Sequence, residues 1–229
     1  HGELVQPMLQ WIARSARCLL VPLRPEQRIA NLATEWQYLL VSAAPEREAL
    51  FQKLKMQHGS EFAFHGSPVE NWHSILRNGL KNASFTPLMT SGAAHGKGIY
   101  LSPSASLSAG YSRVGKKRGG TGDPVIHSSS RSREPGLTGN RKLSVESLKM
   151  LAVCEVVRHP SLSIHGKIWV APKEETVATR FFLIYSDGGV PELSLDEVTV
   201  RTRLRACVEA FCVHGTRETV RGGPSTGPT

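Results

Sequence analysis

The amino-acid sequence predicts a mixed α+β fold, and three observations lead to this prediction. Apolar runs of strand length lie at residues 18–21, 36–41, 62–64, 149–157, 166–170 and 179–186. Apolar side chains at helical spacing, or helix-start signals, lie at residues 4–16, 45–55, 67–79, 103–111 and 195–213. The strands and helices follow one another in a split order rather than a regular alternation, as expected of an α+β domain.

The length and composition are those of a globular domain. The chain has 229 residues, of which 40% are hydrophobic and 21% charged, so it can bury a sizeable core. It contains no run of eighteen apolar residues, and we expect no transmembrane helix. The start at His1 has neither a basic segment nor a long apolar one, so we expect no signal peptide there. Because this start lacks a methionine, we expect the chain to be part of a longer protein.

The four cysteines, at positions 18, 154, 207 and 212, show no metal-binding pattern. None forms a C-x-x-C pair, and no histidine stands at zinc-finger spacing, so we predict no metal site. We expect reduced thiols and a cytoplasmic location, with the nucleus as the alternative. Cys154 lies in an apolar run and is predicted to be a small core residue.

The net charge of +9 is concentrated in two segments. Residues 113–142 hold eight Lys and Arg against two acidic residues, and residues 201–229 hold five Arg against two. Such segments are usually solvated loops, but they can also recruit nucleic acid or acidic partners. Residues 113–142 contain no aromatic side chain on which a base could stack, so nucleic-acid binding is the less favoured interpretation.

The best-marked helix is predicted over residues 67–79. Ser67 suits the N-cap, Pro68 the first helical position, and Glu70 completes an S-x-x-E capping box. Gly79 suits the helix end. Residues 81–95 are predicted to form a loop across the mouth of a pocket.

Two short stretches carry the chemistry, Phe62-Ala-Phe-His-Gly-Ser67 and Gly96-Lys-Gly-Ile-Tyr-Leu-Ser102. The first is a strand that ends in a histidine and a glycine, and binding residues are often held at strand ends. The second pairs two glycines with a strand-like aromatic, which suggests a turn or a backbone that a ligand approaches closely. Together they offer an imidazole, backbone amides and an aromatic face, a set suited to a flat ring that carries an amide.

These residues resemble the NAD signature of the PARP (ADP-ribosyltransferase) family, and most closely its six/eight subgroup. The resemblance extends over roughly residues 1–187 and is strongest in 61–112 and 150–187. It implies two antiparallel sheets around an NAD cleft, with flanking helices. It also implies NAD as the substrate that supplies the transferred group. The residues that carry the resemblance, and that it assigns to NAD binding, are His65, Gly66, Ser67, Gly96, Lys97, Tyr100, Ser108 and Tyr111.

The resemblance also implies a role for each part of this set. The backbone of Gly66 would hold the nicotinamide carboxamide, with a further bond from the Ser108 hydroxyl. Tyr111 would stack on the nicotinamide ring, and Tyr100 would pack against its other side. His65 would bond a hydroxyl of the adenosine-side ribose. Gly96 and Lys97 would border this pocket. Taken singly, each residue has an ordinary structural explanation, but the ordered set at these spacings favours the NAD site.

The resemblance implies three catalytic positions, which fall on His65, Tyr100 and Phe181 in this sequence. Polymer-forming members of the family have a glutamate at the start of the last strand motif, and counting back from Tyr185 places that position at Phe181. Glu174 and Glu175 lie too early to replace it. The resemblance therefore implies a protein mono-ADP-ribosyltransferase, acting on a protein partner or on itself. The alternatives are a weakly active or inactive NAD-binding module and nucleic-acid binding through the basic insert.

The predicted organisation has three parts. Residues 1–60 are a helical and strand lead-in to the catalytic domain, and residues 61–190 are its core. The core carries a basic flexible insert at 113–147. Residues 191–229 form a C-terminal segment that we expect to be partly disordered.

Overall fold

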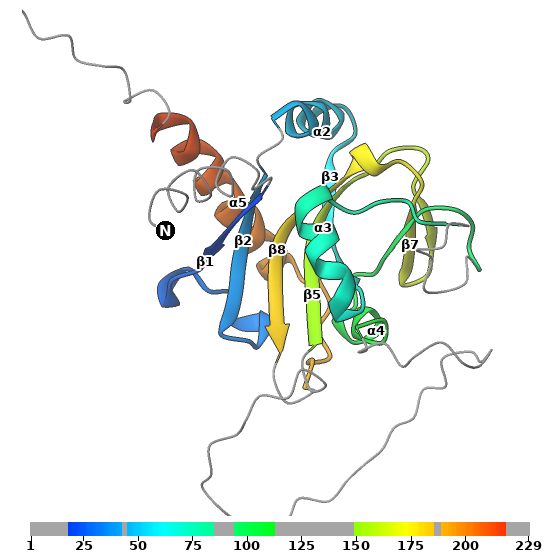
Figure 1. Cartoon of the computed structure of the whole chain (residues 1–229), viewed down its shortest axis with the longest axis horizontal. Coiled ribbons are helices and arrows are strands. Elements are labelled where there is room, and N and C mark those ends of the chain that lie inside the picture. Colours follow the sequence, from blue (N-terminus) through cyan, green and yellow to red (C-terminus); the bar gives the residue numbers. More distant parts are fainter. Residues whose placement is uncertain (1–17, 43–44, 85–93, 113–148, 186–188, 219–229) are drawn as a thin grey trace, which may run out of the picture.

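The computed structural model describes residues 18–42, 45–84, 94–112, 149–185 and 189–218 (Figure 1). The predicted helix over 4–16, the basic insert at 113–147 and the tail at 221–229 lie outside these ranges, as does most of the turn predicted at 187–189. Of the described helices, none has the length and apolar character needed to cross a bilayer.

The larger of two antiparallel sheets has five strands in the order β1-β2-β8-β5-β3. Its strands are β1 (Cys18–Pro22), β2 (Trp36–Ser42), β8 (Val177–Tyr185), β5 (Lys149–Val157) and β3 (Ser60–Gly66). All five were predicted from apolar runs. Because β1 pairs with β2 and β2 pairs with β8, the lead-in at 1–60 contributes two strands to the same sheet that carries β3.

The smaller sheet has the order β4-β7-β6, with β4 at Ile99–Leu101, β7 at Ile168–Ala171 and β6 at Ser163–His165. The sequence predicted one strand over 166–170. The structure instead folds this region as a hairpin, because Gly166 adopts a φ of +60° that turns the chain between β6 and β7. The two sheets join where Phe64 and Ser102 exchange backbone hydrogen bonds of 2.6 and 2.9 Å.

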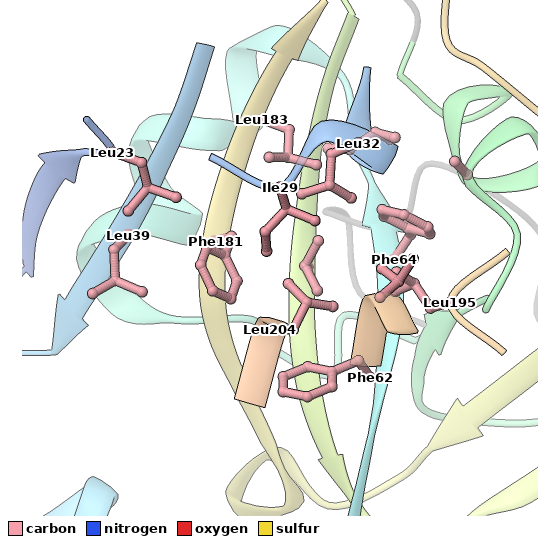
Figure 2. Close-up of a cluster of buried hydrophobic side chains, with 14 of the residues drawn as sticks. Leu23, Ile29, Leu32, Leu39, Phe62, Phe64, Phe181, Leu183, Leu195 and Leu204 are labelled. Atoms are coloured by element: carbon pink, nitrogen blue, oxygen red, sulfur yellow. The ribbon is translucent and has the colours of Figure 1, made fainter. Parts of the chain in front are cut away.

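The five-stranded sheet buries both of its faces. On one face, helix α5 (Val198–Glu218) packs Val200, Leu204 and Val208 against a cluster that includes Phe62 and Phe181 (Figure 2). On the other face lies helix α3 (Trp72–Asn78) (Figure 1). Its Trp72 belongs to a second buried cluster that includes Ala63, Ala152 and Phe182. Cys154 is buried in this second cluster, which confirms the prediction of a core residue. The sheet is thus the central layer of the domain.

Helices α2 (Pro45–His58) and α4 (Ala105–Ala109) lie where helices were predicted. Of the described 3₁₀ turns, η3 (Val69–Asn71) falls within the helix predicted over 67–79, whereas η1 (Pro25–Gln27), η2 (Ala30–Leu32) and η5 (Glu174–Thr176) were not predicted. The capping box at Ser67 was wrong. Pro68 is the extended residue before the 3₁₀ turn η3, and Ser67 Oγ accepts a hydrogen bond from Asn71 Nδ2 (3.0 Å). The helix end at Gly79 was right, with a φ of +76°.

A buried charge network ties α2 to the five-stranded sheet. Arg180 donates to both carboxylate oxygens of Glu48 (2.8 Å each) and to Glu155 (2.9 Å). Glu155 also pairs with Lys55 (2.6 Å) and accepts a bond from Ser60 (2.7 Å). Burial alone would raise the pKa of the Glu155 carboxyl, but Arg180 and Lys55 outweigh it and hold the pKa below its usual value. No sequence pattern predicted this network, because its members are far apart in the chain.

Candidate functional site

A cavity of about 230 Å³ opens between the two sheets, beside α3 and α4. It is lined by the end of β3, by the whole of β4, by five residues of the segment 79–84 and by Asn71, Ser74, Ile75, Leu107, Ser108, Tyr111 and Ile168. Six of the predicted site residues lie on it: His65, Gly66, Ser67, Tyr100, Ser108 and Tyr111. The cavity exists because Phe64 bridges to Ser102, which brings the two stretches singled out in the sequence side by side.

His65 is held in one tautomer. Its Nδ1 lies 2.9 Å from the carbonyl oxygen of Tyr100, and a carbonyl oxygen can only accept, so Nδ1 carries the proton. Part of the ring faces the cavity, but burial lowers the pKa of His65 and this outweighs the opposing effect of the Tyr100 carbonyl. The imidazole is therefore neutral near pH 7, with Nε2 as an acceptor for a ligand hydroxyl.

Gly66 has no room for a side chain. A Cβ at this position would lie 1.8 Å from the backbone oxygen of Ser108. Ser108 is buried, and its hydroxyl donates to the carbonyl of Phe64 (3.2 Å). The C-terminal end of α4 therefore packs directly on the backbone at the end of β3, and this close contact forms one wall of the cavity.

Tyr100 forms the wall on the β4 side, and its hydroxyl is used within the protein. The hydroxyl accepts from the His95 backbone N–H (2.9 Å) and donates to the Gly96 carbonyl (2.9 Å). Gly96 has a φ of +97°, so this turn requires a glycine. Gly98 is needed for a different reason, because a Cβ there would lie 2.6 Å from the Val170 side chain. Tyr100 is thereby fixed as a rigid surface.

Trp72 contacts the His65-Gly66-Ser67 segment at the end of β3 and helps to hold it in place. Its indole Nε1 donates to the Ser67 carbonyl (3.0 Å), and its ring meets that of His65 edge-on with centroids 6.3 Å apart. The same indole also packs edge-on against the Phe182 ring, with the two ring centroids 4.9 Å apart. No sequence pattern revealed the hydrogen bond between Trp72 and Ser67.

The cavity holds polar groups and aromatic rings but no acidic side chain among its described lining residues. Tyr111 is 39% exposed, which leaves its ring accessible from the opening. Among the described residues, no three His, Cys, Asp or Glu side chains are arranged to hold a metal ion. The site therefore offers a neutral imidazole, two tyrosine rings and a tight backbone corner.

Comparison with known proteins identifies the family. A sequence model described as the poly(ADP-ribose) polymerase catalytic domain matches residues 35–126. The chain is 43% identical to the mouse protein mono-ADP-ribosyltransferase PARP8 over 201 aligned residues. These residues cover 86% of this chain and 24% of the mouse protein. The human PARP8 is 42% identical, and the alignment again covers 86% of this chain and 24% of the relative. The human protein mono-ADP-ribosyltransferase PARP16 is 31% identical over 62% of this chain and 35% of the PARP16 length. The chain belongs to the PARP family.

This chain spans about a quarter of the length of the PARP8 proteins that it matches. The matched segment of the PARP family model, 35–126, includes every predicted NAD-binding residue and ends before the last strand motif. The α+β class and two antiparallel sheets expected of a PARP domain are present.

Three residues of the predicted PARP signature do not line the cavity. Gly96 and Lys97 lie on the exposed turn just before it. Phe181 is fully buried in the core on the α5 side of the sheet, because alternation along β8 points it away from the face that carries His65. The cross-strand row of His65 runs through Ala152 to Phe182 instead.

Several lining residues of the PARP cavity were not predicted. They include Ile75, Leu80, Ser84, Gly98 and Ile168. Ser84 has a specific task, since its hydroxyl accepts from the Gly98 backbone N–H (2.9 Å) and so ties the loop after α3 to β4. Ser84 lies in the loop predicted over 81–95, of which residues 85–93 are outside the described ranges. Nothing in the sequence distinguished Ser84 from its neighbours.

Proposed function

We propose that this chain is the catalytic part of a protein mono-ADP-ribosyltransferase, which transfers one ADP-ribose from NAD to a protein side chain and releases nicotinamide. The observation that carries the proposal is the cavity that gathers His65, Gly66, Tyr100, Ser108 and Tyr111. The similarity to the PARP8 proteins, which bear this activity in their names, supports it.

The residues of the cavity fit the nicotinamide end of NAD. A flat ring with a carboxamide suits a slot between Tyr100 and Tyr111, with backbone groups of Gly66 at its edge. A side chain at Gly66 would fill the corner where Ser108 packs, so the close backbone approach depends on glycine. The acceptor Nε2 of His65 suits a ribose hydroxyl.

The transfer needs little chemistry from the protein. The bond between nicotinamide and the ribose carbon breaks, and its electron pair leaves with nicotinamide, which becomes neutral. The acceptor side chain forms the new bond to that carbon and gives its proton to water. The cavity residues hold and orient the dinucleotide while this bond weakens.

The limit to a single transfer follows from the last strand. Strand β8 brings no carboxylate to the cavity: Phe181 and Phe182 are both buried, and the charge of Arg180 is neutralised by Glu48 and Glu155. Without an acid to polarise an incoming ribose hydroxyl, chain elongation is not supported.

The test is intact mass spectrometry of the protein after incubation with NAD. We expect discrete additions of single ADP-ribose units, absent in His65→Ala. A ladder of polymers would contradict the mono-transfer limit. Absence of any addition to the protein or to an added lysate, with NAD binding retained by calorimetry, would favour the alternative of an inactive NAD-binding module. Tyr111→Ala is the matched variant for the binding measurement.

A cytoplasmic location is also part of the proposal. Cys154 and Cys207 are free thiols, as expected in a reducing compartment. Microscopy of the full-length protein carrying a fluorescent tag tests it. Accumulation in the nucleus would favour the alternative, and a role for the basic segment at 113–142 in that case could be tested by deletion.

A further inference from the structure

Two turns with the same tripeptide, His-Gly-Lys, meet beside the cavity. One is His95-Gly-Lys97, just before β4, and the other is His165-Gly-Lys167, between β6 and β7. The imidazole rings of His95 and His165 stack with centroids 4.6 Å apart and an angle of 22° between their planes. The two turns therefore lie side by side, although they come from distant parts of the chain. We call these six residues the twin-turn rim.

The backbone of the twin-turn rim is rigid. Gly96 and Gly166 both have positive φ values, +97° and +60°. The first turn is closed by the Tyr100 hydroxyl, which bonds the His95 N–H and the Gly96 carbonyl. The second turn is closed by the strand pair between His165 and Ile168. The backbone of both turns is therefore held in a defined conformation.

The twin-turn rim borders the proposed NAD cavity. Gly98 and Ile168 line the cavity, and they directly follow Lys97 and Lys167 in the chain. All six rim residues are exposed, and none is acidic. With two exposed lysines and no acid, the rim makes this side of the cavity basic. Such a surface attracts and orients an anionic partner.

We propose that the twin-turn rim binds an acidic segment of the acceptor protein and so orients that protein at the cavity mouth. This inference rests on the proposed function. The described cavity lining contains no acidic side chain, and the rim offers an adjacent charged surface that would orient an acceptor. The twin-turn rim is rigid, exposed and adjacent, and its charge complements a peptide rich in Asp and Glu.

The test measures the binding of two labelled peptides by fluorescence anisotropy. One is rich in Asp and Glu, and the other carries Asn and Gln at the same positions. The test variants are Lys167→Glu and His165→Ala, and the matched control is Lys53→Glu, on the exposed side of α2. We expect Lys167→Glu to weaken binding of the acidic peptide by about fivefold or more, while Lys53→Glu changes it by less than about twofold. The Michaelis constant for NAD should stay at the wild-type value in both.

Four outcomes would overturn the inference. They are equal affinity of the wild-type chain for both peptides, equal weakening by Lys53→Glu, an unchanged affinity in Lys167→Glu, and a raised Michaelis constant for NAD in Lys167→Glu with peptide binding intact. The last would assign the rim to the phosphates of NAD. Tighter binding of a single-stranded RNA, lost in Lys167→Glu, would assign it to nucleic acid.

The same experiment separates this inference from the proposed function. Charge-selective peptide binding without any transfer of ADP-ribose would contradict the proposed function and leave the acidic-segment site standing. Transfer of ADP-ribose without any preference for the acidic peptide would support the proposed function and contradict the acidic-segment site. Salt provides a further readout, because binding through exposed charges should weaken steadily as ionic strength rises.

Discussion

At the scale of single residues, the site depends on contacts that leave no freedom for substitution. Gly66 is the clearest case, because the backbone of Ser108 occupies the place of its missing side chain. His65 is a second, because the Tyr100 carbonyl sets its tautomer and its surroundings keep it neutral. Both features are properties of the folded backbone rather than of the residue types alone.

We predict that Gly66→Ala abolishes transfer of ADP-ribose. The added Cβ would collide with the Ser108 oxygen at 1.8 Å, and moving α4 away would destroy the cavity corner. We expect a loss of stability of about 1–3 kcal/mol in urea unfolding. Gly189→Ala is the control, since a Cβ there meets open space. Wild-type activity in Gly66→Ala would show that the corner can relax.

The pH dependence of His65 gives a second prediction. Its pKa in the folded protein lies below the ordinary 6.5, so the unfolded chain takes up a proton first as the pH falls. The stability contributed by the neutral ring is therefore complete above pH 6.5 and is lost as the pH falls toward the folded pKa. Urea unfolding at pH 7.5 and 5.5 should show a smaller pH effect in His65→Gln than in the wild type.

The same titration should appear in the activity. Because a neutral His65 acts as the acceptor, we expect the rate of transfer to stay level from about pH 8 to 6.5 and to fall only at lower pH. A rate that already falls by half at pH 7 would contradict a lowered pKa.

At the scale of elements, two supports hold the site strands and helices in place. Trp72 connects α3 to the turn after β3, and the network around Arg180 connects α2 to β5 and β8. The first acts next to the cavity, while the second lies away from it. Their loss should therefore have different consequences.

We predict that Trp72→Phe lowers catalytic efficiency more than it lowers stability. Phenylalanine keeps the aromatic contact with Phe182 but removes the donor to the Ser67 carbonyl, a bond worth about 1 kcal/mol. The His65-Gly66-Ser67 turn would then be less well held. Steady-state kinetics should show a several-fold fall in kcat/KM with a small change in melting temperature. Leu76→Ala, on the same helix, is the control for a purely structural loss.

We predict that Arg180→Met destabilises the protein by about 3–5 kcal/mol, because it leaves Glu155 buried without its main partner. Urea unfolding measures this loss. The pKa values of Glu48 and Glu155 are lowered in the folded state. The stability that these two carboxylates contribute is therefore present above about pH 4.5 and is lost at lower pH in the wild type. In Arg180→Met, that acid-sensitive part should be much reduced. A change below about 0.5 kcal/mol would show that the network contributes nothing net.

At the scale of the whole molecule, one sheet organises everything else. Its α5 face forms the main core, and its other face carries α3 and the cavity. The lead-in strands β1 and β2 extend this sheet and α5 packs on it, so segments from both ends of the described chain stabilise the site without lining the cavity.

We predict that Leu204→Ala destabilises the protein by about 2–5 kcal/mol, because this fully buried side chain of α5 fills the core opposite the cavity. The Michaelis constant for NAD should not change below the melting temperature. Val198→Ala, on the same helix but 70% exposed, is the control and should change stability by less than about 0.5 kcal/mol. A raised Michaelis constant in Leu204→Ala would mean that the core and the cavity are coupled.

The sequence by itself determined the elements and most of the site. Periodic apolar residues predicted all five strands of the large sheet, because strand and helix periods are local properties. The signature residues predicted six residues that line the cavity, because a rigid strand end and a glycine turn are readable in the chain.

Only the tertiary structure decided what depends on contacts between distant segments. The register of β8 against β5 decided that Phe181 faces the core and that Phe182 shares the row of His65. The stacking of His95 on His165, and the buried network of Arg180, also join residues far apart in the chain. A strand period predicts that neighbours alternate between faces, but the face that each one takes is set by the partner strand.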